Sequence, residues 1–234
     1  MFSYIYTLSK LGIITTFYSL YSSFKGRNGN SDLYLQTAYK WAEKVIKILK
    51  IKITVNGKEL LNKNSNYVYI SNHLSLIDIP VLTFGLNDNF RIIYKKELEK
   101  IPLFGLGMKY SPFIPVSREG GAEAKKTLSS AIEAMKENKS ILVFAEGTRS
   151  KDGTLGEFKR GAFLLAEKAE KQVVPVTIKG TNLVLPKGKF NYKKGVNVEI
   201  IISAPMDLPE IKNKKTMADF IQEVRDKIYQ NTIK

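Results

Sequence analysis

Short runs of β-branched and aromatic residues recur along most of this chain, and segments with helical spacing lie between several of them. Strands are predicted where such runs occur, at residues 51–55, 67–70, 91–94, 113–116, 141–145, 173–178 and 196–202. Helices are predicted where apolar positions repeat with a helical period, at residues 75–85, 121–138, 161–171 and 216–229. This alternation predicts an α/β fold with a central, mostly parallel sheet flanked by helices. The pattern gives no strand order.

The first fifty residues have a different pattern. Residues 2–24 are apolar and aromatic but rich in hydroxyl groups, and Lys10 interrupts them, which suits the membrane interface better than a membrane crossing. Residues 31–50 form a basic amphipathic helix whose apolar stripe consists of Leu35, Ala38, Ala42, Val45, Ile46 and Leu49. We therefore predict a membrane-embedded helical hairpin at residues 1–50 and one α/β domain at residues 51–234. The alternative is an ordinary helix packed on a soluble core.

Aromatic residues and charge predict a lipid partner for the hairpin. Tyrosine favours the headgroup level of a bilayer, and five tyrosines crowd this end of the chain: Tyr4, Tyr6, Tyr18, Tyr21 and Tyr34. The chain carries 37 Lys and Arg against 22 Asp and Glu, and its net charge of +15 attracts nucleic acid, anionic lipid headgroups or phosphorylated metabolites. The sequence has no recognised nucleic-acid-binding motif, so we expect anionic membrane lipids and no nucleic acid. The predicted location is the cytoplasmic face of the inner cell membrane, as a monotopic or peripheral protein.

Two rare residue types limit the chemistry. The sequence has no cysteine, which excludes disulfides, thiolate metal sites and cysteine nucleophiles. Its one histidine, His73, excludes a histidine-rich metal site, and we predict no metal. Acyl or phosphoryl transfer would therefore use a hydroxyl or carboxylate nucleophile, or pass directly between two substrates.

His73 is the candidate general base, because an imidazole takes up and returns protons near neutral pH. Asp78 follows five positions later, and on one regular helix the two side chains would lie roughly 140° apart. If Ser75 caps a helix that begins after it, Asp78 occupies the third helical position and can reach back to the ring. The carboxylate would then orient the imidazole and leave its second nitrogen as the base. The alternative is that Asp78 only caps the helix.

Candidate phosphate ligands follow two later strands. Arg118 comes after the strand at residues 113–116, where a guanidinium suits a bidentate phosphate contact and a plain surface arginine is the alternative. After the strand at residues 141–145, the candidates are Glu146, Gly147, Thr148, Arg149 and, further on, Lys159. The glycine permits close backbone approach, and the hydroxyl and cationic groups suit a phosphate. The carboxylate can accept from a substrate hydroxyl or orient the arginine.

Several motif blocks occur in order from residue 72 to about residue 180. They are Asn72-His73-x4-Asp78, Lys96-Glu97-Leu98 with Pro102-x-Phe104-Gly105, residues 113–118, Phe144-x-Glu146-Gly147-Thr148-Arg149-Ser150, Phe158-Lys159-x-Gly161 and Val174-Pro175-Val176. Together and in this order, the blocks resemble the PlsC-type glycerolipid acyltransferases. No single block would be specific.

The resemblance implies transfer of a fatty acyl group from an acyl carrier protein or coenzyme A thioester to the sn-2 hydroxyl of 1-acyl-sn-glycerol-3-phosphate (lysophosphatidate), giving phosphatidic acid for phospholipid synthesis. It implies His73 as the base, Asp78 as its partner and no acyl-enzyme. It assigns glycerol phosphate binding to Arg118, Glu146, Gly147, Thr148, Arg149 and Lys159. The thioester is a co-substrate, and no cofactor is expected. Two alternatives stay open: another acceptor, such as glycerol 3-phosphate or another lyso-lipid, and a noncatalytic basic adaptor at the membrane surface.

Overall fold

The computed structural model describes residues 2–27, 31–117, 121–188, 191–211 and 213–233. Within them, seven strands form one sheet in the order β1-β7-β6-β2-β5-β3-β4. The strands are β1 Lys52–Asn56, β2 Val68–Ser71, β3 Phe90–Lys95, β4 Ile114–Val116, β5 Ser140–Phe144, β6 Val173–Lys179 and β7 Asn197–Ile202. Neighbouring strands are parallel except β6 and β7, which are antiparallel. The predicted α/β fold with a mostly parallel sheet is confirmed, and the sheet is mixed.

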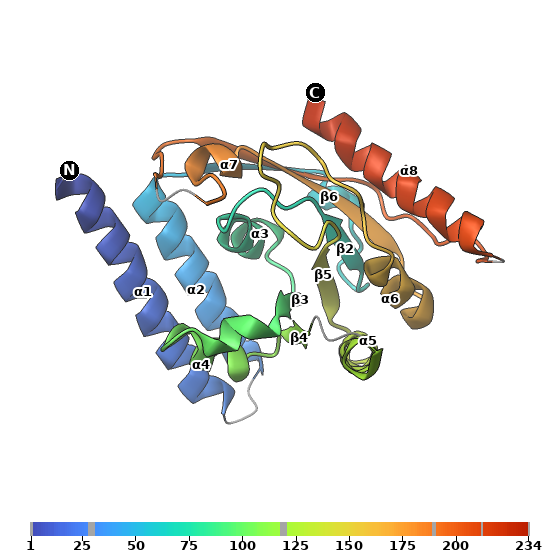
Figure 1. Cartoon of the computed structure of the whole chain (residues 1–234), viewed down its shortest axis with the longest axis horizontal. Helices are drawn as coiled ribbons and strands as arrows, with labels where there is room; N and C mark the ends of the chain where they lie inside the picture. The colour runs from blue at the N-terminus through green and yellow to red at the C-terminus, as the bar shows by residue number, and fades with distance from the viewer. Residues whose placement is uncertain (1, 28–30, 118–120, 189–190, 212, 234) are drawn as a thin grey trace.

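Helices pack on both faces of the sheet (Figure 1). The α-helices are α1 Phe2–Gly26, α2 Ser31–Leu49, α3 Asp78–Leu86, α4 Phe104–Lys109, α5 Gly121–Lys136, α6 Gly161–Ala169, α7 Thr181–Val184 and α8 Lys214–Ile233, with short 3-10 helices η1 Lys58–Leu60 and η2 Lys96–Lys100. The helix that follows β2 was expected to begin directly after Ser75. Instead α3 begins at Asp78, because residues 76 and 77 form a turn.

The alternation of side chains along β2 shows how the sheet divides the core. Tyr67 and Tyr69 pack in the cluster on the α2 and α3 face, whereas Val68 and Ile70 pack in the cluster on the α5, α6 and α8 face. All four side chains are buried. β2 is therefore covered on both sides, as expected for a central parallel strand.

The apolar stripe of α2 packs against the protein. Val45, Ile46 and Leu49 are buried in the same cluster as the sheet, and Ala42 has no exposed surface. For this helix, the structure matches the alternative of a helix packed on a core. Tyr34 also differs from the expectation for a headgroup tyrosine, because it is buried and donates to the carbonyl of Gly107 at 3.0 Å.

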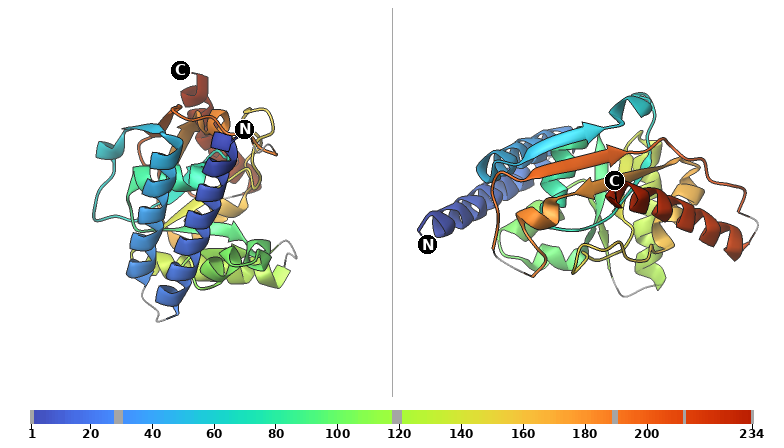
Figure 2. Two further views of the ribbon diagram at one scale, coloured as in Figure 1. Left: turned by 90° about the vertical axis from the view of Figure 1, so that its left-hand side faces the viewer. Right: turned by 90° about the horizontal axis from the view of Figure 1, so that it is seen from above.

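The first helix, α1, has several hydroxyl side chains on its buried face and large apolar side chains on its exposed face. Thr7, Ser19, Ser22 and Ser23 are buried toward the rest of the protein. The exposed face of α1 carries Tyr6, Ile13, Phe17, Leu20 and Phe24. α1 runs beside α2, and its second half packs on α4 (Figure 2). Of the helices described, none is long and apolar enough to cross a membrane.

The contact between α1 and α4 depends on a glycine. A Cβ atom added to Gly107 would lie 2.2 Å from the hydroxyl oxygen of Ser19, so a larger residue at Gly107 would push the helices apart. The Ser19 hydroxyl itself donates to the carbonyl of Phe104 at 2.9 Å. Small and hydroxyl side chains thus let α1 approach the α/β part of the chain closely.

Candidate active site

The register of the central strands brings the predicted loops to one edge of the sheet. β2 pairs in parallel with both β5 and β6, so that Ser71 lies opposite Phe144 on one side and Val176 on the other. The chain therefore leaves all three strands in the same direction. His73 follows β2, the phosphate-ligand candidates from Glu146 onward follow β5, and Gly180 follows β6.

His73 and Asp78 form a close pair. Nδ1 of His73 lies 2.7 Å from Oδ2 of Asp78, and Asp78 has no exposed surface. The histidine side chain is 15% exposed, so the ring reaches the surface beside a fully buried carboxylate. The engaged Nδ1 leaves Nε2 as the nitrogen that can accept a proton from a bound molecule.

Asp78 also closes the turn that precedes its own helix. The backbone N–H groups of Leu74 and Ser75 donate to its Oδ2, at 2.7 and 2.9 Å. The hydroxyl of Thr181 donates to its Oδ1. One carboxylate thus closes the turn before α3 and contacts the imidazole, whereas α3 itself begins without a side-chain cap.

The backbone and the ring of His73 are both held by the segment after β5. Its N–H donates to Oε1 of Glu146 at 2.8 Å, and its carbonyl accepts from the N–H of Ser150 at 2.7 Å. The ring stacks on Phe144, with centroids 3.9 Å apart and planes inclined by 17°. These contacts fix the imidazole relative to the loop that carries the predicted phosphate ligands.

Glu146 was expected to contact a substrate hydroxyl or Arg149. In the structure it is buried, and its second carboxylate oxygen accepts from the N–H of Gly156 at 2.9 Å. Its two oxygens thus join the backbone of His73 to that of Gly156. Glu146 therefore holds the loop at His73 and the loop at Gly156 together, and its contact with substrate stays a prediction.

The other loop candidates gather around Gly147. This glycine has φ +68°, a left-handed conformation that favours glycine, and an added Cβ would lie 3.0 Å from Nζ of Lys159. Thr148 and Lys159 are exposed, and Arg149 is partly buried. Lys159 therefore lies beside the loop that Ser150 joins to the carbonyl of His73. Arg118 lies outside the described residues, so its predicted place near them is not tested.

A turn stabilises the chain just after Arg149. Oδ1 of Asp152 accepts from both the hydroxyl and the N–H of Thr154, at 2.6 and 3.0 Å. These hydrogen bonds lower the pKa of Asp152 to about 2. The carboxylate is therefore ionised, and holds the turn, at any pH well above that value.

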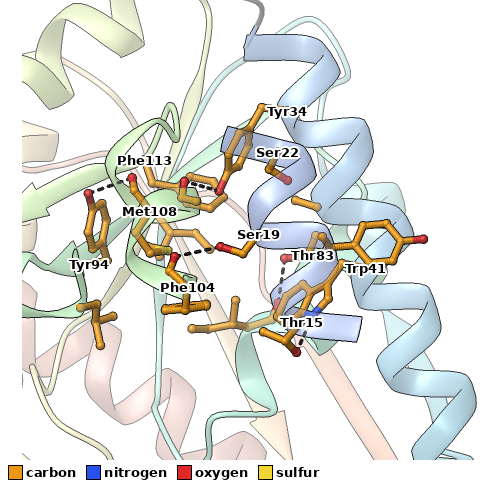
Figure 3. Close-up of a pocket in the computed structure, with 16 residues that line it drawn as sticks. Thr15, Ser19, Ser22, Tyr34, Trp41, Thr83, Tyr94, Phe104, Met108 and Phe113 are labelled. Carbon is orange, nitrogen blue, oxygen red and sulfur yellow. Dashed lines mark hydrogen bonds between the residues drawn. The ribbon is translucent and has the colours of Figure 1, made fainter. Parts of the chain in front are cut away.

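An apolar cavity of about 110 Å³ lies between α1, α2, α3 and α4 (Figure 3). The polar groups on its wall bond to one another: the indole N–H of Trp41 donates to the Thr15 hydroxyl at 3.1 Å, and Tyr34 donates to Gly107. Burial raises the pKa of Tyr34 above its ordinary value, so its hydroxyl stays a donor. Ile79 and Thr83 of α3 also line the cavity, which places it along the helix that begins at Asp78.

Several residues of the site were missed in the sequence. Phe144 stacks on the imidazole. In the sequence, the only sign of this role was that Phe144 comes two positions before Glu146. Thr181 and Lys187 contact the site from a segment more than a hundred residues after His73, and no local pattern links such distant positions. Among the residues described, no group of three or more metal-ligating side chains lies close enough to hold a metal ion.

Comparison with known proteins shows which family the chain belongs to. A family model described as Acyltransferase matches residues 52–179, more than half of the 234 residues. The chain belongs to this acyltransferase family. The matched region runs from β1 to the end of β6 and contains the His73–Asp78 pair and the loop at Gly147.

Relatives of the chain are named as 1-acyl-sn-glycerol-3-phosphate acyltransferases, and the PlsC-type family that the sequence motifs predicted is confirmed. The chain is 38% identical over 156 residues to the chloroplastic 1-acyl-sn-glycerol-3-phosphate acyltransferase of Arabidopsis thaliana, covering 66% of this chain and 44% of that protein. It is 35% identical over 186 residues to the 1-acyl-sn-glycerol-3-phosphate acyltransferase of Saccharomyces cerevisiae, covering 77% and 60%. The chain spans about half the length of the curated relatives it matches.

A solved structure of the family extends the likeness to almost the whole chain. The crystal structure of the 1-acyl-sn-glycerophosphate (LPA) acyltransferase PlsC from Thermotoga maritima matches with a TM-score of 0.77 and 26% sequence identity. The match covers 98% of this chain and 95% of that one. It therefore includes the N-terminal helices as well as the sheet.

Proposed function

We propose that this acyltransferase transfers a fatty acyl group from an acyl carrier protein or coenzyme A thioester to the sn-2 hydroxyl of 1-acyl-sn-glycerol-3-phosphate. The products are phosphatidic acid and a free thiol. The observation that carries the proposal is the pair of a surface-reaching imidazole and a buried carboxylate, 2.7 Å apart, in His73 and Asp78. Such a pair can deprotonate an alcohol. The names of the relatives support the choice of acceptor.

In the proposed reaction, Nε2 of His73 removes the proton of the acceptor hydroxyl as its oxygen attacks the thioester carbonyl carbon. A carbon–oxygen bond forms, the carbon–sulfur bond then breaks, and the imidazolium returns the proton to the leaving thiolate. Asp78 stabilises the imidazolium while it exists. The acyl group passes directly between the substrates, in keeping with a sequence that has no cysteine.

The acceptor phosphate is proposed to bind Arg118, Arg149 and Lys159, with Thr148 as a hydroxyl donor. Support comes from the bond between Ser150 and His73, because it ties the loop to the base. A phosphate held on this loop would present the rest of the acceptor to the imidazole. Binding of this kind orients the acceptor hydroxyl before the reaction, which lowers the activation barrier of acyl transfer.

The cavity between the helices is proposed to hold part of an acyl chain. Its wall is largely apolar, and the Trp41, Thr15 and Tyr34 polar groups already have partners. At about 110 Å³ it is smaller than a cavity of roughly 150 Å³ that admits benzene, so it can take only a segment of a fatty acyl chain unless the helices move.

A membrane containing anionic lipid is the proposed partner of the outer face of α1. Exposed aromatic and aliphatic side chains on one helix face favour contact with a bilayer. Exposed apolar residues of the nearby segment from η2 to α4 extend this surface: Ile101, Leu103 and Leu106. Lys25 lies near the rings of Tyr21 and Phe24, within 5.4 and 5.8 Å of their centroids, so a cation flanks the apolar face.

An acceptor panel tests the proposed reaction. The full chain in vesicles is offered lysophosphatidate, glycerol 3-phosphate, a lysophosphatidylcholine and a monoacylglycerol, each with an acyl-coenzyme A or an acyl carrier protein thioester. Thiol release and lipid products are measured. We expect phosphatidic acid from lysophosphatidate. Turnover with another acceptor alone would reassign the substrate. If no acceptor is turned over, the alternative of a noncatalytic adaptor at the membrane surface would be favoured.

A further inference from the structure

The chain directly after β6 contacts the site, although none of the sequence motifs covers it. Residues 181–187, the α7 segment, begin with Thr181, whose hydroxyl donates to Oδ1 of Asp78. Further on, the carbonyl of Leu185 accepts from the Ser75 hydroxyl at 2.7 Å. We infer that the α7 segment positions both the catalytic pair and the phosphate-binding loop, with Thr181 as the positioning residue for Asp78. The inference rests on the proposed function.

The place of Thr181 is set by the sheet and by one glycine. Gly180 follows the last residue of β6 and has φ +90°, and a Cβ added there would lie 2.6 Å from the carbonyl oxygen of Asn197. The chain therefore turns tightly against β7 and enters α7 at once. Thr181 itself has no exposed surface, and its carbonyl accepts from the N–H of Leu185 at 3.0 Å. Its hydroxyl is thus presented by a packed element with little freedom to move.

The two oxygens of Asp78 receive different donors. Oδ2 lies against the imidazole and the two N–H groups of its own loop, whereas Oδ1 receives the Thr181 hydroxyl. Removing that hydroxyl leaves a buried anionic oxygen without this donor and weakens the restraint on carboxylate rotation. The effect reaches the reaction through His73. Substrate binding should be little affected, because Thr181 is buried.

The other end of the α7 segment contacts the phosphate-binding loop. Nζ of Lys187 donates to the carbonyl of Arg149 and lies 3.4 Å from the hydroxyl of Thr148. Lys187 therefore holds the backbone of the loop that carries the proposed phosphate ligands. Its loss should loosen acceptor binding more than it slows the chemical step, so the two ends of the segment predict opposite kinetic signatures.

Three variants test the Thr181 end. Thr181→Val removes the hydroxyl with little change of shape, Thr181→Ser keeps the hydroxyl, and Thr177→Val is a matched loss of a buried threonine hydroxyl in β6. We expect kcat of Thr181→Val to fall about ten- to a hundredfold with both KM values within twofold of wild type. Thr181→Ser and Thr177→Val should keep kcat within about threefold. Each variant is assayed with the acceptor that gives turnover in the wild type.

Thermal unfolding of the same proteins separates positioning from folding. If Thr181→Val and Thr177→Val lower both Tm and kcat alike, the positioning role of Thr181 is wrong. If Thr181→Val does not fold, Thr181→Ala is compared with Thr181→Ser, and equal kcat values for these two would also overturn the role.

Lys187→Met tests the other end, with Lys193→Met as an exposed control of equal charge change. We expect Lys187→Met to raise KM for a phosphorylated acceptor about tenfold and to leave KM for the thioester unchanged. An equal KM for the acceptor in both variants would contradict contact between the α7 segment and the loop.

The single histidine gives a readout that does not need turnover. Nitrogen-15 labelling of histidine produces the resonances of one imidazole, and its Nδ1 proton reports the bond to Asp78. We expect this signal to shift or broaden in Thr181→Val and to stay in place in Thr177→Val. Unchanged spectra in both would refute the positioning role. A wild type with no turnover on any acceptor would instead refute the proposed function, and the spectra would still test the contact.

Discussion

Asp78 holds its position through backbone groups as much as through the imidazole. The N–H groups of Leu74 and Ser75 converge on the oxygen that faces His73. Because these donors belong to the chain itself, a change in the ring leaves the carboxylate in place. The imidazole can therefore be tested by substitution while the carboxylate keeps its backbone donors.

At the residue scale, His73→Ala should abolish the base and lower kcat about a thousandfold, within the range of general-base catalysis. The protein should still fold, because the backbone of His73 keeps its hydrogen bonds to Glu146 and Ser150. Initial rates of thiol release and thermal unfolding measure both effects. Near-normal turnover in this variant would end the proposed mechanism.

Asp78→Asn should lower kcat by about two orders of magnitude or more, because the amide cannot stabilise the imidazolium. Its shape preserves most of the hydrogen bonds to the turn before α3, and so circular dichroism should show a folded protein. A variant that keeps wild-type kcat would leave Asp78 only a structural role in the turn before α3.

The sequence indicated this pair but not its surroundings. A lone histidine and an aspartate five positions away can be read locally, and so can a serine that caps a turn. Phe144 and Thr181 could not be assigned, because their contacts with the pair depend on which strands are neighbours. Strand order is set by packing across the sheet, which a local pattern does not record.

At the scale of elements, the loop after β5 should control acceptor affinity. Arg149→Ala and Lys159→Met should each raise KM for lysophosphatidate about tenfold or more, since each removes a cation from the proposed phosphate site. KM for the thioester should not change. Lys168→Met, an exposed lysine of α6, is the control for charge, and equal acceptor KM values in all three variants would reject the site.

The cavity between the helices predicts a change in chain-length preference. Ala38 lines it, so Ala38→Phe should fill part of the space and shift the preferred thioester toward shorter acyl chains. Competition between thioesters of different length measures the shift. Gln36→Phe places the same ring on the exposed side of α2, and an equal shift there would show that the cavity does not hold the acyl chain.

The elements that the sequence missed are short and poor in local signal. α4 contains two glycines, Gly105 and Gly107, which disfavour a helix, and it follows Leu103 with φ +64°. The α4 helix forms because those glycines allow close packing on η2 and α1. By contrast, each strand range predicted from residue pattern overlaps a strand of the sheet, since runs of β-branched and aromatic residues are a local signal.

At the scale of the whole molecule, α1 and α8 lie on opposite sides (Figure 1). Ile13 on α1 and Ile233 on α8 are 69% and 68% exposed, a matched pair. Ile13→Asp should weaken binding to vesicles with anionic lipid about tenfold or more, because burying one isoleucine contributes roughly 2 kcal/mol. Ile233→Asp should bind like wild type. Equal binding of the two in a vesicle sedimentation assay would contradict the membrane-facing role of α1.

The pairing of β1 with β7 fixes an order of events during synthesis. β1 lies at the edge of the sheet and has β7 as its neighbour, so residues 52–56 stay unpaired until residues 197–202 have left the ribosome. α1 is complete long before then. We therefore expect the nascent chain to meet lipid while its sheet is still open, and a product that stops before β7 to expose a strand edge prone to aggregation.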